Sequence, residues 1–165
     1  MTLGLSLSAF TLLHVIISLA GLGSGFVVVW GWFNSRRLDG WTAIFLVTTV
    51  LTSVTGFMFP FEGFKPSYVL AVLSLIVLAI AIYARYSKRM VGSWRGIYVV
   101  TAAIALYFNC FVAIVQSFMK IPALHALAPK GNEPPFAIAQ AILLALFVWL
   151  TYKARKRFLV TPSAA

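Results

Sequence analysis

Four side chains in apolar stretches of this sequence could do chemistry inside a membrane. They are His14, Asn109, Gln116 and Gln140. An imidazole can donate or accept a hydrogen bond or bind a metal, and a carboxamide is both donor and acceptor. Such groups suit the oxygens of a quinone, and an imidazole suits the iron of a haem. Whether they act together depends on the elements that position them.

The composition predicts an integral membrane protein. Of the 165 residues, 62% are hydrophobic and 10% charged, and the mean hydropathy is +0.98, whereas soluble domains carry about 25% charged residues. The net charge of +10 lies in short runs between apolar stretches, a distribution that argues against a nucleic-acid partner. A single cysteine, Cys110, excludes an internal disulfide and a thiolate metal cluster.

Five apolar runs without charged residues are long enough to cross a hydrocarbon core of about 30 Å. We expect each to be a helix, because a helix satisfies its own backbone in lipid. Pro122 and Pro129 bracket a further short helix, expected at the outer interface. The sequence thus predicts an all-α, polytopic transmembrane helical bundle forming one domain over residues 1–165, with spans at 9–34, 41–59, 67–84, 96–119 and 134–152 and the interfacial helix at 121–128.

Basic residues predict the orientation of the bundle. Ten of the thirteen fall in the first connection, the third connection and the C-terminal tail, and the others are Lys65, Lys120 and Lys130. Because loops rich in Lys and Arg stay in the cytoplasm, we expect the N-terminus outside and the C-terminus inside. All five tryptophans fall at the expected cytoplasmic ends, where indoles favour the headgroup layer.

The polar residues in the spans favour the outer half of the bundle. His14, Ser18, Gly21 and Gly25 share one helical face, and this small-residue stripe predicts that His14 points toward a neighbouring helix. Asn109 and Gln116, seven residues apart, also share a face, and Gln140 enters from the outer side. These residues predict a polar pocket open to the outside. The alternative is that they only hydrogen bond between helices, for about 0.6 to 2 kcal/mol each.

No catalytic constellation is visible in the sequence. The spans contain no Asp, Glu, Lys or Arg, and no nucleophile stands beside a base. Glu62 and Glu133 are expected to be solvated loop charges. A haem with two axial histidines would need His125 from the interfacial helix, because no other span holds a histidine. We therefore expect no enzymatic activity and no metal site built from protein ligands alone, and a haem with a single protein ligand stays open.

The second half of the chain resembles a group of uncharacterised small multi-span bacterial inner-membrane proteins with no assigned activity. The resemblance rests on Trp94-Arg95-Gly96-Ile97-Tyr98, on residues 111–118 and 121–129, and on Glu133-Pro134-Pro135-Phe136. It implies a multi-pass protein of the bacterial cytoplasmic membrane and transfers no functional residue.

Three functions remain open from the sequence. The first is a structural or accessory membrane protein, surrounded by lipid, that associates with itself or with a larger membrane complex. The second is a binding module for a lipid-soluble cofactor, quinone or haem, held by His14, Asn109, Gln116 and Gln140. The third is a facilitator for a small neutral solute through the same pocket.

Overall fold

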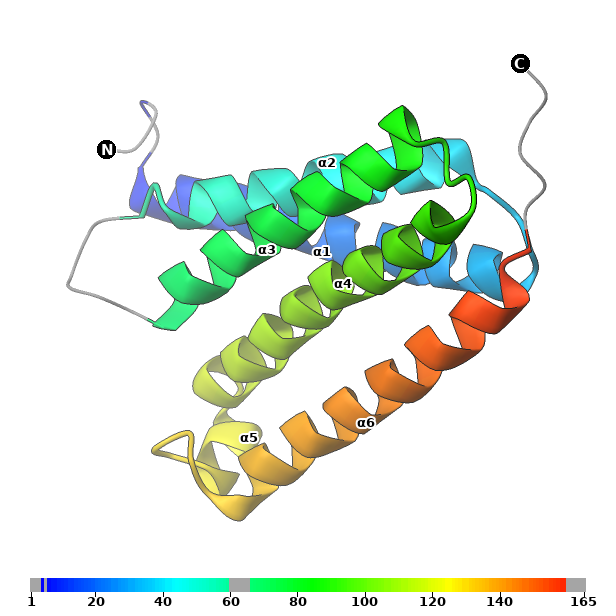
Figure 1. Cartoon of the computed structure of the whole chain (residues 1–165). Helices are drawn as coiled ribbons and strands as arrows, with labels where there is room; N and C mark the ends of the chain where they lie inside the picture. Colours follow the sequence, from blue (N-terminus) through cyan, green and yellow to red (C-terminus); the bar gives the residue numbers. More distant parts are fainter. Residues whose placement is uncertain (1–3, 5, 60–65, 160–165) are drawn as a thin grey trace.

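The computed structural model describes residue 4, residues 6–59 and residues 66–159, all of its regular structure helical (Figure 1). Helices lie at every expected position, with ends shifted by a few residues. Four of them are long and apolar enough to cross a membrane, namely α1, α3 with its extension, α4 and α6; α2 is not among these four. The helices are α1 (Leu7–Phe33), α2 (Asp39–Gly56), α3 (Pro66–Ile82), its π-helical extension η1 (Tyr83–Ser87), α4 (Ser93–Lys120), α5 (Pro122–Leu127) and α6 (Pro134–Arg157).

Local sequence signals set several helix ends. The Ser6 hydroxyl caps α1 by accepting a hydrogen bond from the N–H of Ala9 at 3.2 Å. Pro122 and Pro134 stand in the first turns of α5 and α6, where the missing N–H costs nothing. The turn before α6 is organised by Glu133, whose carboxylate accepts from the N–H groups of Lys130 and Asn132 at 3.0 and 3.1 Å.

The carboxyl of Glu133 has a shifted pKa. Desolvation acts to raise the pKa of its carboxyl, but the surrounding backbone N–H groups outweigh it, and the pKa lies below its ordinary value. The sequence placed Glu133 in a solvated loop, and the structure adds that the carboxylate orders this loop.

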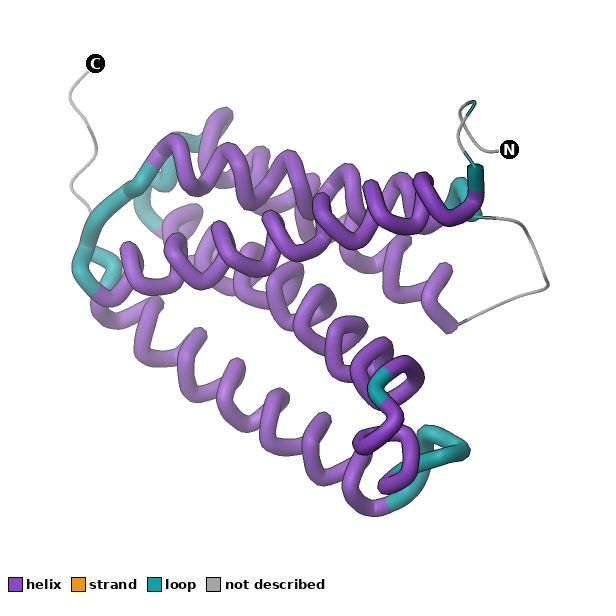
Figure 2. Tube along the Cα trace, turned by 180° about the vertical axis from the view of Figure 1, so that it is seen from behind, coloured by secondary structure: helices purple, strands orange, loops and turns teal. Residues whose placement is uncertain are grey.

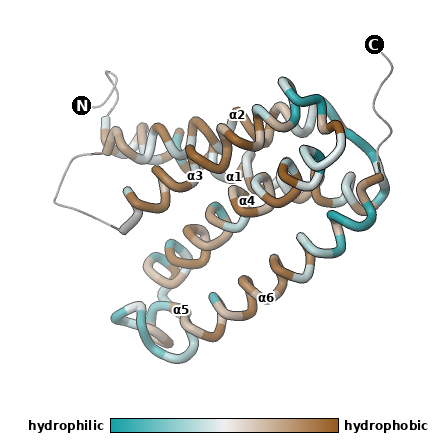
Figure 3. The backbone as a smooth tube through the Cα atoms, in the orientation of Figure 1, coloured by the Kyte–Doolittle hydropathy of each residue, from teal (hydrophilic) through white to brown (hydrophobic). Residues whose placement is uncertain are grey.

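The helices pack in chain order, with α2 against α1, α3 against α2, α4 against α3, and α6 against α4 (Figures 1 and 2). The α1–α2 connection, the α3–α4 connection and the C-terminal end of α6 meet at one end of the bundle, which we call the basic end. Two contacts show this meeting: the Ser35 hydroxyl donates to the carbonyl of Arg157 at 2.6 Å, and Arg155 lies against Gly96. Figure 3 shows these segments as hydrophilic. The opposite end, where α1 starts and α5 lies, is the far end.

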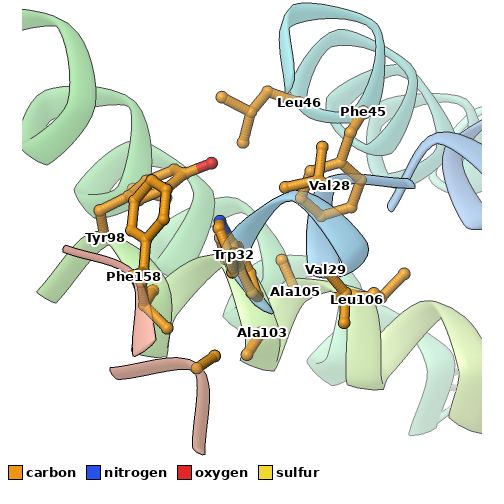
Figure 4. Packing of buried hydrophobic residues seen from close by; sticks show 14 of the residues in the cluster. Val28, Val29, Trp32, Phe45, Leu46, Tyr98, Ala103, Ala105, Leu106 and Phe158 are labelled. Carbon is orange, nitrogen blue, oxygen red and sulfur yellow. The ribbon is translucent and has the colours of Figure 1, made fainter. Parts of the chain in front are cut away.

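The hydrophobic core lies toward the basic end (Figure 4). Phe45, Leu46 and Leu106 are 1–2% exposed there. A side chain at Gly25 would place its Cβ 2.5 Å from the Leu106 Cδ1 atom and 3.1 Å from the Phe45 ring, so this glycine permits the close approach of α1 to α2 and α4.

Trp32 differs from the expected interfacial tryptophans. It is 1% exposed and packs edge-on against the ring of Tyr98, 5.9 Å between centroids. By contrast, Trp30, Trp41 and Trp149 are about half exposed, as side chains of a headgroup belt would be. The expectation for Trp32 was wrong because residue spacing gives its depth along the helix but not the face that the next helix covers.

Arg85 also differs from its expected place among the loop charges. The chain stays helical through η1, and the Arg85 side chain is 1% exposed. Its Nη2 atom donates to the Asp39 carboxylate at 2.6 Å and to the Arg37 carbonyl at 3.1 Å, while the guanidinium lies 5.1 Å from the centre of the Tyr98 ring. Arg85 thus ties the α1–α2 connection to α3 and α4.

A candidate ligand-binding cavity between four helices

A cavity of about 610 Å³ lies between α1, α2, α3 and α4 in the half of the bundle toward the far end. Its position follows from the helix arrangement: α4 diverges from α1 and α2 toward the far end (Figure 1), and the walls separate accordingly. We call it the polar cavity, because eleven of its lining side chains are polar. They are Thr11, His14, Ser18, Thr52, Ser53, Tyr68, Ser74, Asn109, Gln116, Ser117 and Lys120.

Most of the hydroxyls in the polar cavity already have acceptors within their own helices. A hydroxyl three or four residues after a backbone carbonyl can donate to it along the helix. In the cavity such bonds run from Thr11 to Leu7, from Ser18 to His14, from Ser53 to Thr49 and from Ser117 to Ala113, at 2.7 to 3.0 Å. These hydroxyl protons are therefore committed to the protein.

His14 is held from one side and open on the other. Its Nδ1 atom lies 2.7 Å from the Thr55 hydroxyl oxygen, and the Phe59 ring packs edge-on against the imidazole at 5.2 Å. The Thr55 hydroxyl donates its one proton to the Leu51 carbonyl at 2.7 Å, so its oxygen accepts from Nδ1–H.

The fixed tautomer gives His14 a defined role. With the proton on Nδ1, the Nε2 atom carries a lone pair, and no group in the described part of the chain hydrogen bonds to it. His14 therefore offers the polar cavity a hydrogen-bond acceptor, or one metal-ligating nitrogen. A ligand that donates a hydroxyl proton matches it.

Asn109 lies deeper, where α1, α2 and α4 meet. Its Nδ2 atom donates to the Thr49 hydroxyl at 3.2 Å, and a Cβ at Gly21 would lie 3.5 Å from that nitrogen. Gly21 belongs to the stripe that includes His14, so the missing side chain lets the amide sit against α1. The Nδ2 atom of Asn109 thus makes a hydrogen bond between α4 and α2, whereas its Oδ1 atom has no hydrogen-bond partner among the residues described.

Gln116 and Thr52 add further uncommitted groups. Gln116 lines the polar cavity about two helical turns from Asn109 toward the far end, as their spacing predicts. Its carboxamide makes no hydrogen bond within residues 6–59 and 66–159. The Thr52 hydroxyl oxygen is buried with no partner among the same residues. A buried polar atom left alone costs free energy, and a bound ligand or water would recover it.

Gln140 does not line the polar cavity. It lies on α6, on the other side of α4, where its Nε2 atom donates to the Phe111 carbonyl at 3.3 Å. Depth along the helix grouped Gln140 with the other three residues, but the order of helix packing separates it from them. Its contact joins α6 to α4.

His125 does not line the polar cavity either. It is exposed on α5, so His14 is the one histidine available there to an iron. Among the described residues no three His, Cys, Asp or Glu side chains gather as a metal site would require. The cavity could offer the iron of a haem only one axial nitrogen, that of His14. Its other polar groups suit a molecule that is recognised by hydrogen bonds.

Lys120 was expected in a loop and is instead the last residue of α4, on the rim of the polar cavity. Among the described residues that line the cavity, Lys120 is a cation and none is a carboxylate. Toward the basic end the cavity stops where Gly25, Phe45 and Leu106 pack together. Within the described part of the chain the polar cavity is therefore closed toward the basic end, and Lys120 lies on its rim.

Comparisons with models of protein families, with curated proteins and with solved structures found no match to this chain. The function must therefore be inferred from the site itself.

Proposed function

We propose that this protein binds a lipid-soluble ligand of the quinone class in the polar cavity. The observation that carries the proposal is the convergence of His14, Asn109 and Gln116, each with an uncommitted hydrogen-bonding atom, on one cavity. Residues that serve only to join helices are expected to use their polar atoms on one another. A cavity of about 610 Å³ is within the range of small-molecule sites.

At His14 the polarity of the site matches the reduced form of a quinone, the quinol, because Nε2 and a quinone carbonyl oxygen are both acceptors. The His14 Nε2 lone pair suits a ring hydroxyl, so reduction of the ring strengthens that contact. The Gln116 amide and the Lys120 ammonium are donors and suit a ring oxygen. Apolar residues such as Phe108 and Leu22 line the rest of the cavity and suit the ring and its tail.

We also propose that the chain crosses the membrane five times, with the polar cavity facing outward. The path and the length of α2 support counting it as the fifth span. The helix α2 leads from the basic end, where α1 finishes, back toward the far end, where α3 begins, and its 18 residues extend about 27 Å. The basic residues gathered at one end support a cytoplasmic C-terminus. The sequence resemblance supports the bacterial cytoplasmic membrane.

An accessory role within an oligomer or a larger membrane complex is compatible with ligand binding and stays a prediction. Gentle extraction followed by native mass spectrometry tests it, since a lone monomer would count against it. A solute facilitator is not favoured, because the polar cavity is closed by the packed core.

The ligand test uses protein extracted gently from its own membranes, with native mass spectrometry, an absorption spectrum and solvent extraction of quinones. We expect close to one quinone per chain, and loss of most of it in His14→Ala. The matched control is Ser117→Ala, because Ser117 lines the same cavity with its hydroxyl already bonded to α4.

Two results would overturn the proposal. One is a bare chain, or a chain carrying only exchangeable phospholipid. The other is equal quinone content in His14→Ala and the parent protein. An absorption spectrum of haem would support ligand binding in the cavity but would identify the ligand as a haem and not a quinone.

A further inference from the structure

A second hollow lies between α4 and α6 and shares no lining residue with the polar cavity. It has a volume of about 590 Å³, and we call it the α4–α6 groove. One face of each helix forms it, with lining residues three or four apart. Ala103, on the floor, is 1% exposed, and its small side chain leaves the groove its depth.

The α4–α6 groove is apolar along most of its length and cationic at one end. On α6 it runs from Leu144 to Lys156, about 18 Å at 1.5 Å per residue. That length is close to the hydrocarbon depth of one leaflet, about 15 Å. Tyr107 and Phe147, packed edge-on at 5.7 Å, lie at the apolar end, and Arg155 and Lys156 lie at the basic end of the bundle.

The two cations have no protein counter-ion in the described part of the chain. Asp39 is used by Arg37 and Arg85. Glu133 stands at the opposite end of α6, about 33 Å from Arg155 along the helix. Arg155 is held against Gly96, and Lys156 lies over the Tyr152 ring, 4.3 Å from its centre. Both positive charges are thus fixed beside the groove without being neutralised.

We propose that the α4–α6 groove binds one anionic phospholipid. One acyl chain lies along the groove against Ala103 and Phe147, and the phosphate sits between Arg155 and Lys156. Charge complementarity identifies the occupant, because a basic site between membrane helices attracts an anionic headgroup, and the apolar floor has the length of one acyl chain. This site is independent of the quinone proposal.

The experiment is native mass spectrometry of the full chain in mild detergent, titrated with phosphatidylglycerol or phosphatidylethanolamine. We expect phosphatidylglycerol to be retained preferentially, and its apparent affinity to fall about fivefold for each of Arg155→Gln and Lys156→Gln. Lys153→Gln is the matched control, because Lys153 is an exposed cation of the same helix end that does not line the groove.

A second pair of variants tests the acyl chain. Ala103→Leu fills the floor of the groove and should lower retention while all charges remain. If that variant does not fold, Val148→Trp fills the groove from its open side, since Val148 is 62% exposed. Equal retention of the two lipids, or an equal loss in Lys153→Gln, would overturn the proposal. Unchanged retention in the filled variants would do the same.

Discussion

Removing the Asp39 carboxylate should destabilise the protein more than its exposed position suggests. The Asp39 side chain is 70% exposed, whereas the Arg85 side chain that it neutralises is 1% exposed. In Asp39→Ala the guanidinium stays buried, and its remaining contacts are the Arg37 carbonyl, the Met90 sulfur at 3.8 Å and the rings of Tyr98 and Tyr86. Its Nε atom already has no partner among the described residues.

The magnitude follows from this asymmetry. Breaking a buried ion pair by removing one partner costs about 3 to 5 kcal/mol. Because Asp39 itself is solvated, water replaces part of its interaction, and we expect the lower limit, about 3 kcal/mol. For a chain of this size that corresponds to a fall in melting temperature of about 6 to 12 °C.

The assay is thermal unfolding in one detergent, followed by tryptophan fluorescence and compared across three variants. Asp39→Ala should melt well below the parent. Asp39→Ala combined with Arg85→Met should recover most of the loss, because the buried charge is gone and the methionine fills similar space. A double variant no more stable than Asp39→Ala, or a single variant that melts like the parent, would refute the reasoning.

Three further predictions test other parts of the fold. Gly25→Ala should cost about 1 to 3 kcal/mol, because the new methyl meets Leu106, whereas Gly23→Ala, which meets nothing within 4 Å, should leave the melting temperature unchanged or raise it. Because the pKa of Glu133 is lowered, the stability that its ionised carboxylate contributes is complete above the ordinary pKa of 4.5 and is lost as the pH falls through the lowered value. Glu133→Gln should therefore speed amide hydrogen exchange in the preceding loop already at neutral pH. Unchanged exchange would contradict this. A reporter fused after Ala165 should be active in the cytoplasm, and activity only outside would reverse the orientation.

Much of the fold could be predicted from the sequence because it depends on one-dimensional information. The length of an apolar run sets the length of a helix in lipid, so the helices begin and end close to their expected residues. Spacing along a helix sets which side chains share a face, and it correctly placed Asn109 and Gln116 on one wall and turned His14 into the bundle.

The differences arise where helix neighbours decide the outcome. Gln140 has the expected depth, but α6 packs on the side of α4 away from the polar cavity, and nothing local encodes that order. Because Arg85 is followed by Lys88 and Arg89, the sequence predicts that all three are charges of one loop. In the structure the π-helical turn carries the Arg85 side chain into the bundle. Thr55, which fixes the His14 tautomer, is one of several hydroxyl residues on α2, and only the register of α1 against α2 brings its side chain to His14.

The two halves of the bundle differ in a way that bears on function. Near the basic end, Trp32, Tyr98 and Arg85 are buried and linked, and such contacts resist local opening. Toward the far end the helices separate around polar groups that are only partly used. Because its stability is concentrated in the closed half, the chain can keep an open half with unsatisfied groups. This division predicts that His14→Ala loses its ligand, and that the free energy of unfolding of the ligand-free variant stays within about 1 kcal/mol of that of the ligand-free parent. A large loss of stability would show instead that His14 holds the helices together.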